Sequence, residues 1–312
     1  SLKKWYLKTQ SSGFGLIIGG NKMLKEPYII NPSALSYACF HCEYMNINYG
    51  LKNEGVRAPV TNVLDTLEKK LLLEKKTNLI SSELKEGTII DPSDNTFYSK
   101  IKEHENGISF RIKGKCDAIV KYTDGSSGII DYKTSKFRNN PYKENKAKFN
   151  EKNFKIKLNE YGKQLHAYRF LYSNLETDDK FIKEVYVKNY IDRYRVKDPS
   201  KIEKFHKKII EQINNIAIEK VNSLGLLLFY PEKLIESTKD TTALNEINFN
   251  FGLEYFPVSI DEKEFYKQLG ELLKVLNQPK PPDPPEECKR CTMHQAFYDD
   301  EKVIKFERKM KL

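Results

Sequence analysis

The chain has 312 residues, enough for one large domain or two small ones with a substantial buried core. Aromatic residues make up 12% of the sequence, which argues against a disordered chain. The formal net charge of +10 favours a polyanionic partner, and nucleic acid fits better than a membrane, because no basic amphipathic helix with a clear apolar face stands out. No stretch reaches transmembrane length. The first residues contain no secretory segment, so we expect an intracellular protein.

Two Cys-x-x-Cys pairs lie near opposite ends of the sequence. Cys39 and Cys42 follow a predicted helix start, and Cys288 and Cys291 follow a stiff proline-rich stretch. Four thiolates can form a tetrahedral Zn²⁺ site or hold an iron–sulfur cluster, and either would tie the two ends of the chain together. Ordinary reduced thiols or a redox pair would explain the same residues without a metal, whereas the expected compartment disfavours disulfides.

Two histidines and a fifth cysteine could also take part in a site. His41 lies within the first cysteine pair and His294 just beyond the second, and each is either a reserve metal ligand or not a ligand. Cys116 is expected to be a buried strand residue.

Residues 56–74 have the pattern of an amphipathic helix. The apolar residues that recur at helical spacing are Val63, Leu67 and Leu71. The helix also carries Asp65 and Glu68, which could simply be exposed carboxylates paired with Lys69 and Lys70.

Residues 107–135 predict a β-hairpin, because apolar and polar residues alternate on both sides of a turn at Asp124–Gly125. The returning strand places Asp131 and Lys133 on one face. Asp117 and Asp131 lie at about equal distances from the turn, so antiparallel pairing would make these two carboxylates neighbours.

The neighbouring carboxylates predict a chemistry. They repel each other unless one is protonated or a cation lies between them, and such oxygen ligands suit Mg²⁺ or Mn²⁺. Lys133 beside such an ion could orient or help to deprotonate a water molecule and offset negative charge on a phosphoryl group. We therefore expect metal-assisted hydrolysis of a phosphodiester, although a surface hairpin with solvated charges explains the same residues.

The second half of the chain supplies a loop and further elements. Residues 136–157 mix lysines with aromatic residues, which suits either a loop that guides a nucleic-acid strand or a solvated loop. A helix at about 160–175 places Gln164 and Tyr168 on the same side. The other expected elements are a strand at 181–190, a helix at 202–224, strands at 226–230 and 247–260, and a helix at 262–276.

Gly114, Asp117 and the strand ending in Asp131-Tyr-Lys133-Thr resemble the active-site hairpin of the PD-(D/E)XK nucleases. The Gln-x-x-x-Tyr spacing on the following helix is similar to that of their RecB-like branch. The resemblance implies an α/β fold with a restriction-endonuclease-like core, in which a central mixed sheet is flanked by helices, within a single domain over residues 1–312. It also implies Mg²⁺ or Mn²⁺ as cofactor and DNA, as single strands or duplex ends, as substrate.

The resemblance assigns roles to individual residues. The catalytic residues it implies are Asp117, Asp131, Lys133, Gln164 and Tyr168. The metal ligands it implies are Asp117, Asp131, the backbone carbonyl of Tyr132 and, on the helix before the hairpin, Asp65, with Glu68 as second choice.

The family also implies a cofactor and a setting. A cysteine-bound [4Fe–4S] cluster would join the segment at about 31–50 to the segment at about 279–298, with Zn²⁺ as the alternative because the cysteines here are divided two and two rather than one and three. We expect an exonuclease in DNA repair, recombination or foreign-DNA processing. No helicase motif occurs in the sequence, so a helicase or recombination partner would be a separate chain. The rival hypothesis is a catalytically inactive nucleic-acid-binding or scaffold protein of the same fold.

Overall fold

The computed structural model describes residues 26–36, 39–50, 59–92, 95–134, 151–235, 248–286, 288 and 291. The strands are β1 (Tyr28–Ile30), β2 (Gly87–Ile90), β3 (Phe97–Tyr98), β4 (Lys102–Glu103), β5 (Ser109–Gly114), β6 (Ala118–Tyr122), β7 (Ser127–Thr134), β8 (Val221–Ile235) and β9 (Asn248–Val258). The helices are α1 (Pro32–Ser36), α2 (Phe40–Tyr49), α3 (Pro59–Leu72), η2 (Thr77–Leu79), α4 (Glu151–Ser173), α5 (Asp179–Ile182), η3 (Lys183–Val187), α6 (Lys188–Tyr194), α7 (Pro199–Ile216) and α8 (Glu262–Leu276).

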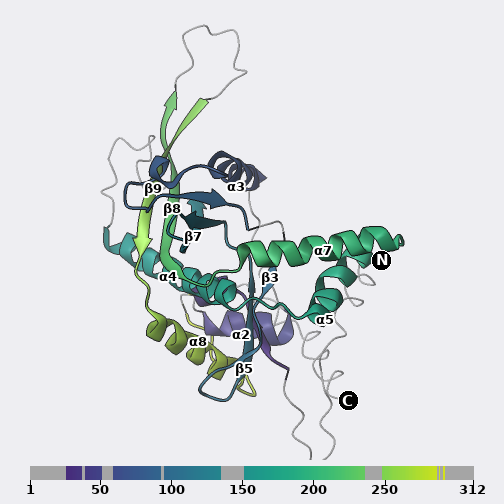
Figure 1. Ribbon diagram of the computed structural model, residues 1–312. Helices are drawn as coiled ribbons and strands as arrows, with labels where there is room; N and C mark the ends of the chain where they lie inside the picture. Colours follow the sequence, from purple (N-terminus) through teal and green to yellow (C-terminus); the bar gives the residue numbers. More distant parts are fainter. Residues whose placement is uncertain are drawn as a thin grey trace, which may run out of the picture.

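The strands form two sheets. The five-stranded sheet has the order β2-β6-β7-β8-β9, in which β7 and β8 are parallel and the other neighbours are antiparallel. In the smaller sheet, β5 pairs in parallel with β1 and antiparallel with β3 and β4. β8 and β9 run side by side and extend above the other strands (Figure 1). The expected mixed sheet flanked by helices is confirmed.

The five-stranded sheet is buried on both faces, and the side chains alternate between them as strand geometry requires. Ile119 and Ile129 belong to the core that also contains Leu165 of α4. Val120 and Ile130 belong to a second core, which includes Leu72 at the end of α3 and other residues on the opposite face. The predicted hairpin therefore lies at the centre of the molecule, because β6 and β7 each contribute residues to both cores.

The predicted strand at 181–190 is wrong, because the structure forms the helical run α5, η3 and α6 there. Asp178 caps this run by accepting a hydrogen bond from Phe181 N at 2.9 Å. Phe181 and Tyr186 both pack edge-on against Tyr98 of β3. This aromatic cluster stabilises the helical run, and such tertiary packing overrides the strand preference of its β-branched and aromatic residues.

The predicted helix at 202–224 is too long at its end. α7 ends at Ile216, and Ile218 N donates to Tyr172 O at 3.1 Å, so the chain leaves the helix there. Ser127 N then donates to Lys220 O at 3.0 Å, which starts the pairing of β8 with β7. The predicted helix at 262–276 is confirmed.

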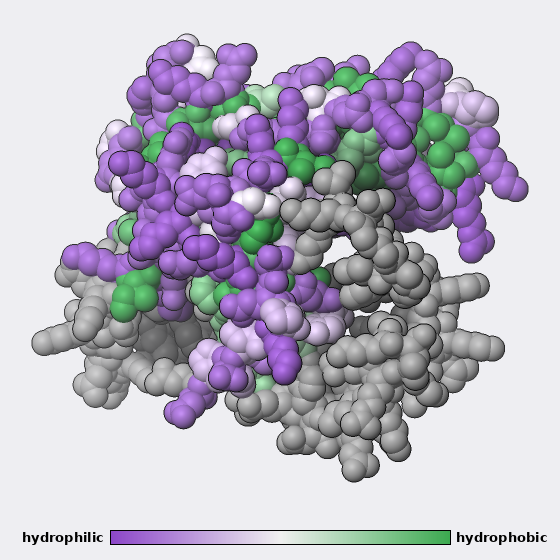
Figure 2. Space-filling model, turned by 90° about the horizontal axis from the view of Figure 1, so that it is seen from below, coloured by the Kyte–Doolittle hydropathy of each residue, from purple (hydrophilic) through white to green (hydrophobic). Residues whose placement is uncertain are grey.

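The described part of the face shown in Figure 2 is mostly polar. In the view of Figure 2 hydrophilic residues predominate and apolar residues form small separate patches. Among the described residues, none of the helices combines the length and the hydrophobicity that crossing a membrane would require.

Candidate active site

The pairing of β6 with β7 brings Asp117 beside Asp131. Ala118 lies opposite Ile130, and Asp117 immediately precedes β6, so the same register continued by one residue places it opposite Asp131. Tyr132 N donates a hydrogen bond to Asp117 Oδ2 at 2.9 Å, which fixes the Asp117 carboxylate against β7. The structure thus confirms that the two carboxylates are neighbours.

Lys133 lies on the same face of β7 as Asp131. Its ammonium group forms an ion pair with Asp131 Oδ2 and lies 5.3 Å from the centre of the Tyr161 ring on α4. The Asp131 side chain is only 2% exposed, whereas that of Lys133 is 23% exposed. The ammonium group therefore lies between a buried carboxylate and the solvent, from which a substrate would approach.

The two carboxylates differ in their protonation. Burial raises the pKa of Asp131 to about 7. The negative charge of Asp117 adds to this effect, and the positive charge of Lys133 opposes it. Burial also disfavours the charged form of Asp117, but Lys69, Lys133 and the Tyr132 N–H lower its pKa below the usual range. Asp117 is therefore ionised at neutral pH, while Asp131 is the carboxylate on which a proton and a cation compete.

These residues fit a divalent metal ion. Asp131 Oδ2 is buried and forms an ion pair with Lys133. A cation between Asp117 and Asp131 would remove the repulsion between the two carboxylates. Carboxylate oxygens are the ligands that Mg²⁺ and Mn²⁺ prefer.

The backbone of Tyr132 and its side chain face different surroundings. The ring packs edge-on against Phe229 in the core on the far side of the sheet, with the centroids 6.0 Å apart. The backbone N–H of Tyr132 contacts Asp117, and the role of its carbonyl group as a metal ligand stays a prediction.

Helix α4 adds two polar side chains to the face that carries Asp131. Gln164 Nε2 donates to Tyr168 Oη at 3.2 Å, and both side chains are buried. Burial and the negative charge of Asp131 raise the pKa of Tyr168 well above its ordinary value. Tyr168 therefore keeps its proton at neutral pH, so its hydroxyl group is able to donate a hydrogen bond. His166, between them in sequence, binds Gly162 O and Asp261 N instead.

Helix α3 supplies a carboxylate and a lysine at the edge of the site. Glu68 is buried, and its Oε1 accepts a hydrogen bond from Thr134 Oγ1 at the end of β7 at 3.0 Å. Asp65 is 52% exposed and forms an ion pair with Lys69 at 3.1 Å. The structure thus places Glu68, the second choice, closer to the hairpin than Asp65.

Lys69 is a residue of the site that the sequence did not reveal. Its Nζ lies 3.0 Å from Asp117 Oδ1, so it bridges α3 and the hairpin. The sequence indicated only its i,i+4 pairing with Asp65, because the contact with Asp117 joins residues far apart in the chain.

Gly114, at the end of β5, is required by close packing. A Cβ atom there would lie 2.8 Å from Pro32 Cγ and 3.1 Å from Tyr168 Cε1. We expect Gly114→Ala to destabilise the protein by about 1–3 kcal/mol through overpacking, and to lower activity because Tyr168 has to move. Urea unfolding measures the first effect, and an unchanged midpoint at an unchanged slope would contradict it.

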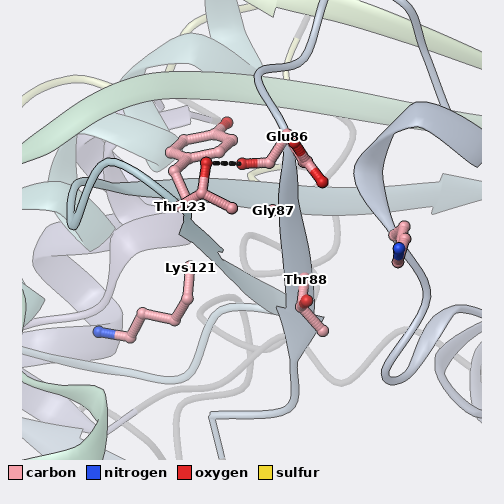
Figure 3. A pocket seen from close by; sticks show the side chains of 7 residues that line it. Glu86, Gly87, Thr88, Lys121 and Thr123 are labelled. Carbon is pink, nitrogen blue, oxygen red and sulfur yellow. Dashed lines mark hydrogen bonds between the residues drawn. The ribbon is translucent and has the colours of Figure 1, made fainter.

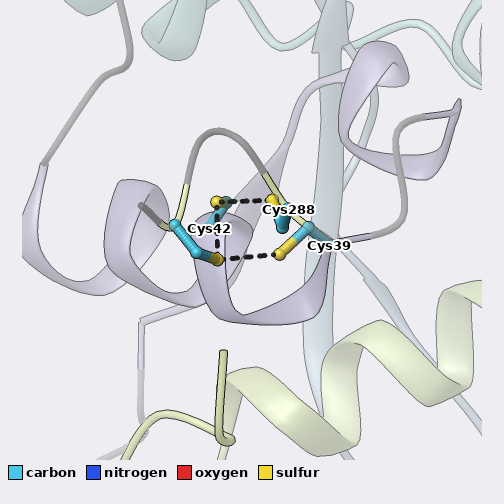
Figure 4. Close-up of side chains that lie close together, drawn as sticks. Cys39, Cys42 and Cys288 are labelled. Atoms are coloured by element: carbon cyan, nitrogen blue, oxygen red, sulfur yellow. Dashed lines mark hydrogen bonds between the residues drawn. The ribbon is translucent and has the colours of Figure 1, made fainter. Parts of the chain in front are cut away.

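The four cysteines of the two Cys-x-x-Cys pairs meet in one cluster (Figure 4). The sulfur atoms all lie within 4.8 Å of one another, and Cys39, Cys42 and Cys291 are buried. Burial and the neighbouring thiols raise the pKa of Cys291 to about 12 and that of Cys42 still higher. The thiolates would therefore form together only around a cation, and this cluster can hold a metal.

His41 and Cys116 lie in the described part of the chain, and His294 does not. His41 Nδ1 donates to Pro282 O at 2.7 Å, and Cys116 is fully buried at the start of the hairpin, as expected. His294 and most of the lysine-rich segment 136–157 lie outside the described residues.

A cavity of about 350 Å³ lies at the other end of β6. Lys121, Tyr122 and Thr123 line it together with Gly87 and Thr88 of β2 (Figure 3). Asp117 precedes the first residue of β6, whereas the last residues of β6 line this cavity. The cavity is therefore separate from the carboxylate site.

Comparison with known proteins places the chain in a family. The model of the PD-(D/E)XK nuclease superfamily matches residues 53–296. This range is more than half of the chain, and the chain belongs to the PD-(D/E)XK nuclease superfamily. Membership supports a nuclease-type function with DNA as the implied substrate, and nucleases of this superfamily usually use Mg²⁺ or Mn²⁺.

Solved and curated proteins add little beyond the family. A solved structure described as "Crystal structure of SSO0001" is 14% identical in sequence, with 83% of this chain and 81% of that chain covered and a TM-score of 0.39. A search of curated proteins gives no significant match.

Proposed function

We propose that this protein is a Mg²⁺- or Mn²⁺-dependent deoxyribonuclease of the RecB-like branch that acts as an exonuclease on single strands or duplex ends. The observation that carries the proposal is the meeting of Asp117, Asp131 and Lys133 on one face of the hairpin. In this proposal the described chain is part of a single domain, whose N-terminal and C-terminal segments are joined by the cysteine cluster. A helicase or recombination partner would be a separate chain.

The proposed roles follow from the contacts. Asp117, Asp131 and the backbone carbonyl of Tyr132 hold the ion, which when bound acidifies water and neutralises charge on the phosphoryl group. Lys133 orients the attacking water and donates hydrogen bonds to the developing negative charge. Lys69 keeps Asp117 ionised, since it lowers the pKa of that carboxyl group.

The outer residues position these groups. The proposed role of Tyr168 is to donate a hydrogen bond within the site, and Gln164, which donates to Tyr168 Oη, holds this hydroxyl group in place. Glu68 takes the role of the acidic residue on the helix before the hairpin, because it is buried beside Thr134, whereas Asp65 is half-exposed.

Defined DNA substrates test this function. We would incubate the protein with end-labelled linear single strands, linear duplexes and a circular single strand, each with Mg²⁺, Mn²⁺ or EDTA. The proposal predicts metal-dependent degradation of linear DNA from its ends while the circle stays intact. Cleavage of the circle would indicate an endonuclease instead. Binding without cleavage in both metals would indicate the non-catalytic nucleic-acid-binding protein.

Metal binding should depend on pH. Since the pKa of Asp131 is raised to about 7, a proton competes with the ion below this pH. We expect the affinity for Mn²⁺ to fall about tenfold between pH 8 and pH 6, because only about a tenth of a group with this pKa is ionised at pH 6. Isothermal titration calorimetry measures this dependence, and an affinity that rises toward pH 6 would contradict it.

The protonation of Asp131 also affects the stability of the folded protein. The unfolded state releases this proton near pH 4, whereas the folded state keeps it up to about pH 7. In the absence of metal, the contribution of Asp131 to stability is therefore greatest at low pH and is lost as the pH rises through this window. The thermal midpoint of Asp131→Asn should lack this pH dependence, so the variant serves as the control for the wild-type protein.

A further inference from the structure

The sulfur atoms of the cysteine cluster lie close together. The distances between Sγ atoms are 3.3 Å for Cys39 and Cys291, 3.4 Å for Cys42 and Cys291, and 3.8 Å for Cys42 and Cys288. No pair is more than 4.8 Å apart. In Figure 4 the sulfur atoms of the labelled residues Cys39, Cys42 and Cys288 lie close together.

These separations match one ion and not a cluster of irons. A Zn–S bond of about 2.3 Å places the four sulfur atoms of a tetrahedral site about 3.8 Å apart. In a [4Fe–4S] cluster each thiolate binds a different iron, so the thiolates have to be separated by the full width of the cluster. Sulfur atoms that all lie within 4.8 Å of one another leave no room for four irons and their sulfides.

Contacts outside the cluster hold the start of α2 beside the segment that follows α8. His41 Nδ1 donates to Pro282 O at 2.7 Å, and Tyr44 Oη donates to Gln278 O at 3.0 Å. Asn48 Nδ2 and Tyr28 Oη both donate to Leu276 O, at 3.1 and 2.9 Å. These bonds tie α2 and β1 to the end of α8 and the segment after it.

The donor set is purely sulfur. Among the described residues, the atoms close enough to share one ion belong to the four cysteines, and neither ring nitrogen of His41 is among them. Cys39 is the N-cap of α2 and Cys42 lies in its first turn, where the helix dipole favours negative charge. Four thiolates in a closed tetrahedral site are a common structural zinc set.

We infer that Cys39, Cys42, Cys288 and Cys291 hold a single zinc ion, in place of the [4Fe–4S] cluster that the family resemblance implies. With four protein ligands the ion has no open position for a substrate, so its role is structural. It joins the start of α2 to the segment that follows α8. This assignment is independent of nuclease activity.

Metal analysis of the whole chain tests the inference. The protein should be purified without oxygen from iron-supplied cells, because a cluster lost to air could be replaced by zinc during purification. We expect about one zinc per chain, no acid-labile sulfide and no absorption near 400 nm, roughly, where iron–sulfur proteins absorb. Iron with labile sulfide, or one iron in place of zinc, would overturn the inference.

A pair of variants locates the metal. Cys42→Ser should lose nearly all of the zinc, whereas Cys116→Ser should keep it, because Cys116 is the fifth cysteine and lies in the hairpin core outside the cluster. Equal zinc contents in the two variants would contradict the inference. If Cys42→Ser does not fold, the Co²⁺-substituted wild-type protein decides: a tetrahedral thiolate spectrum supports the site, and an octahedral spectrum excludes it.

Discussion

Asp131→Asn is expected to reduce metal-dependent DNA cleavage by at least about a thousandfold. The substitution preserves the shape of the side chain and removes the negative charge that would hold the ion beside Asp117. The stability of the fold should not fall, because the wild-type carboxylate is buried and burial raises its pKa to about 7. Loss of cleavage together with an unchanged or higher thermal midpoint therefore identifies a functional carboxylate.

The same hairpin offers a control for this variant. Asp124 lies at its turn, is exposed and pairs with Lys85 at 2.8 Å. Asp124→Asn makes the same chemical change far from the proposed site and should leave cleavage within about twofold of wild type, as expected for surface substitutions. An active Asp131→Asn variant would remove Asp131 from the catalytic residues.

Lys133→Met is expected to reduce the rate of cleavage by about 100-fold to 1000-fold while DNA binding is retained. Methionine keeps much of the side-chain length and the contact with the Tyr161 ring, but it cannot donate hydrogen bonds to water or phosphate. Because Lys133 lowers the pKa of Asp131, its loss should also move the pH dependence of Mn²⁺ binding upward. Single-turnover cleavage and calorimetry measure the two effects.

Lys113→Met is the matched control for the lysine. Lys113 lies on β5 and also places its ammonium group over an aromatic ring, at 5.1 Å from the centre of Tyr98, but it does not contact the carboxylates. Its substitution should leave both cleavage and the pH dependence near wild type. If the two variants lose activity equally, Lys133 acts only as one basic residue among many.

Much of the hairpin could be predicted from the sequence because its signals are local. Alternating side chains and the turn at Asp124 and Gly125 determine which residues pair, and the observed register of β6 with β7 agrees. Gly125 has φ 79°, a conformation that glycine adopts readily. The position of Asp117 opposite Asp131 follows from this register alone.

The features that could not be predicted from the sequence depend on packing between residues far apart in the chain. Lys69 reaches Asp117, and Glu68 reaches Thr134, only because α3 packs against β7, and no spacing within the sequence reports that contact. The helical run at 179–194 contains β-branched and aromatic residues that favour a strand, and its packing against β3 decides otherwise.

The cysteine cluster, too, could be predicted from the sequence only in part. The two Cys-x-x-Cys pairs indicated that the ends of the chain could share one metal site, and the structure brings all four thiols together. The kind of metal is inferred from the distances between the sulfur atoms, which the spacing of the cysteines in the sequence does not give.

The binding of Mn²⁺ to the wild-type chain and to Asp117→Asn and Asp131→Asn, followed by electron paramagnetic resonance, tests the shared carboxylate site most directly. We predict about one tightly bound ion per wild-type chain and a loss of this ion in either variant, because one or two carboxylates are the usual protein ligands of such an ion. Unchanged Mn²⁺ binding in both variants would contradict the account, because the two aspartates would then not hold the metal.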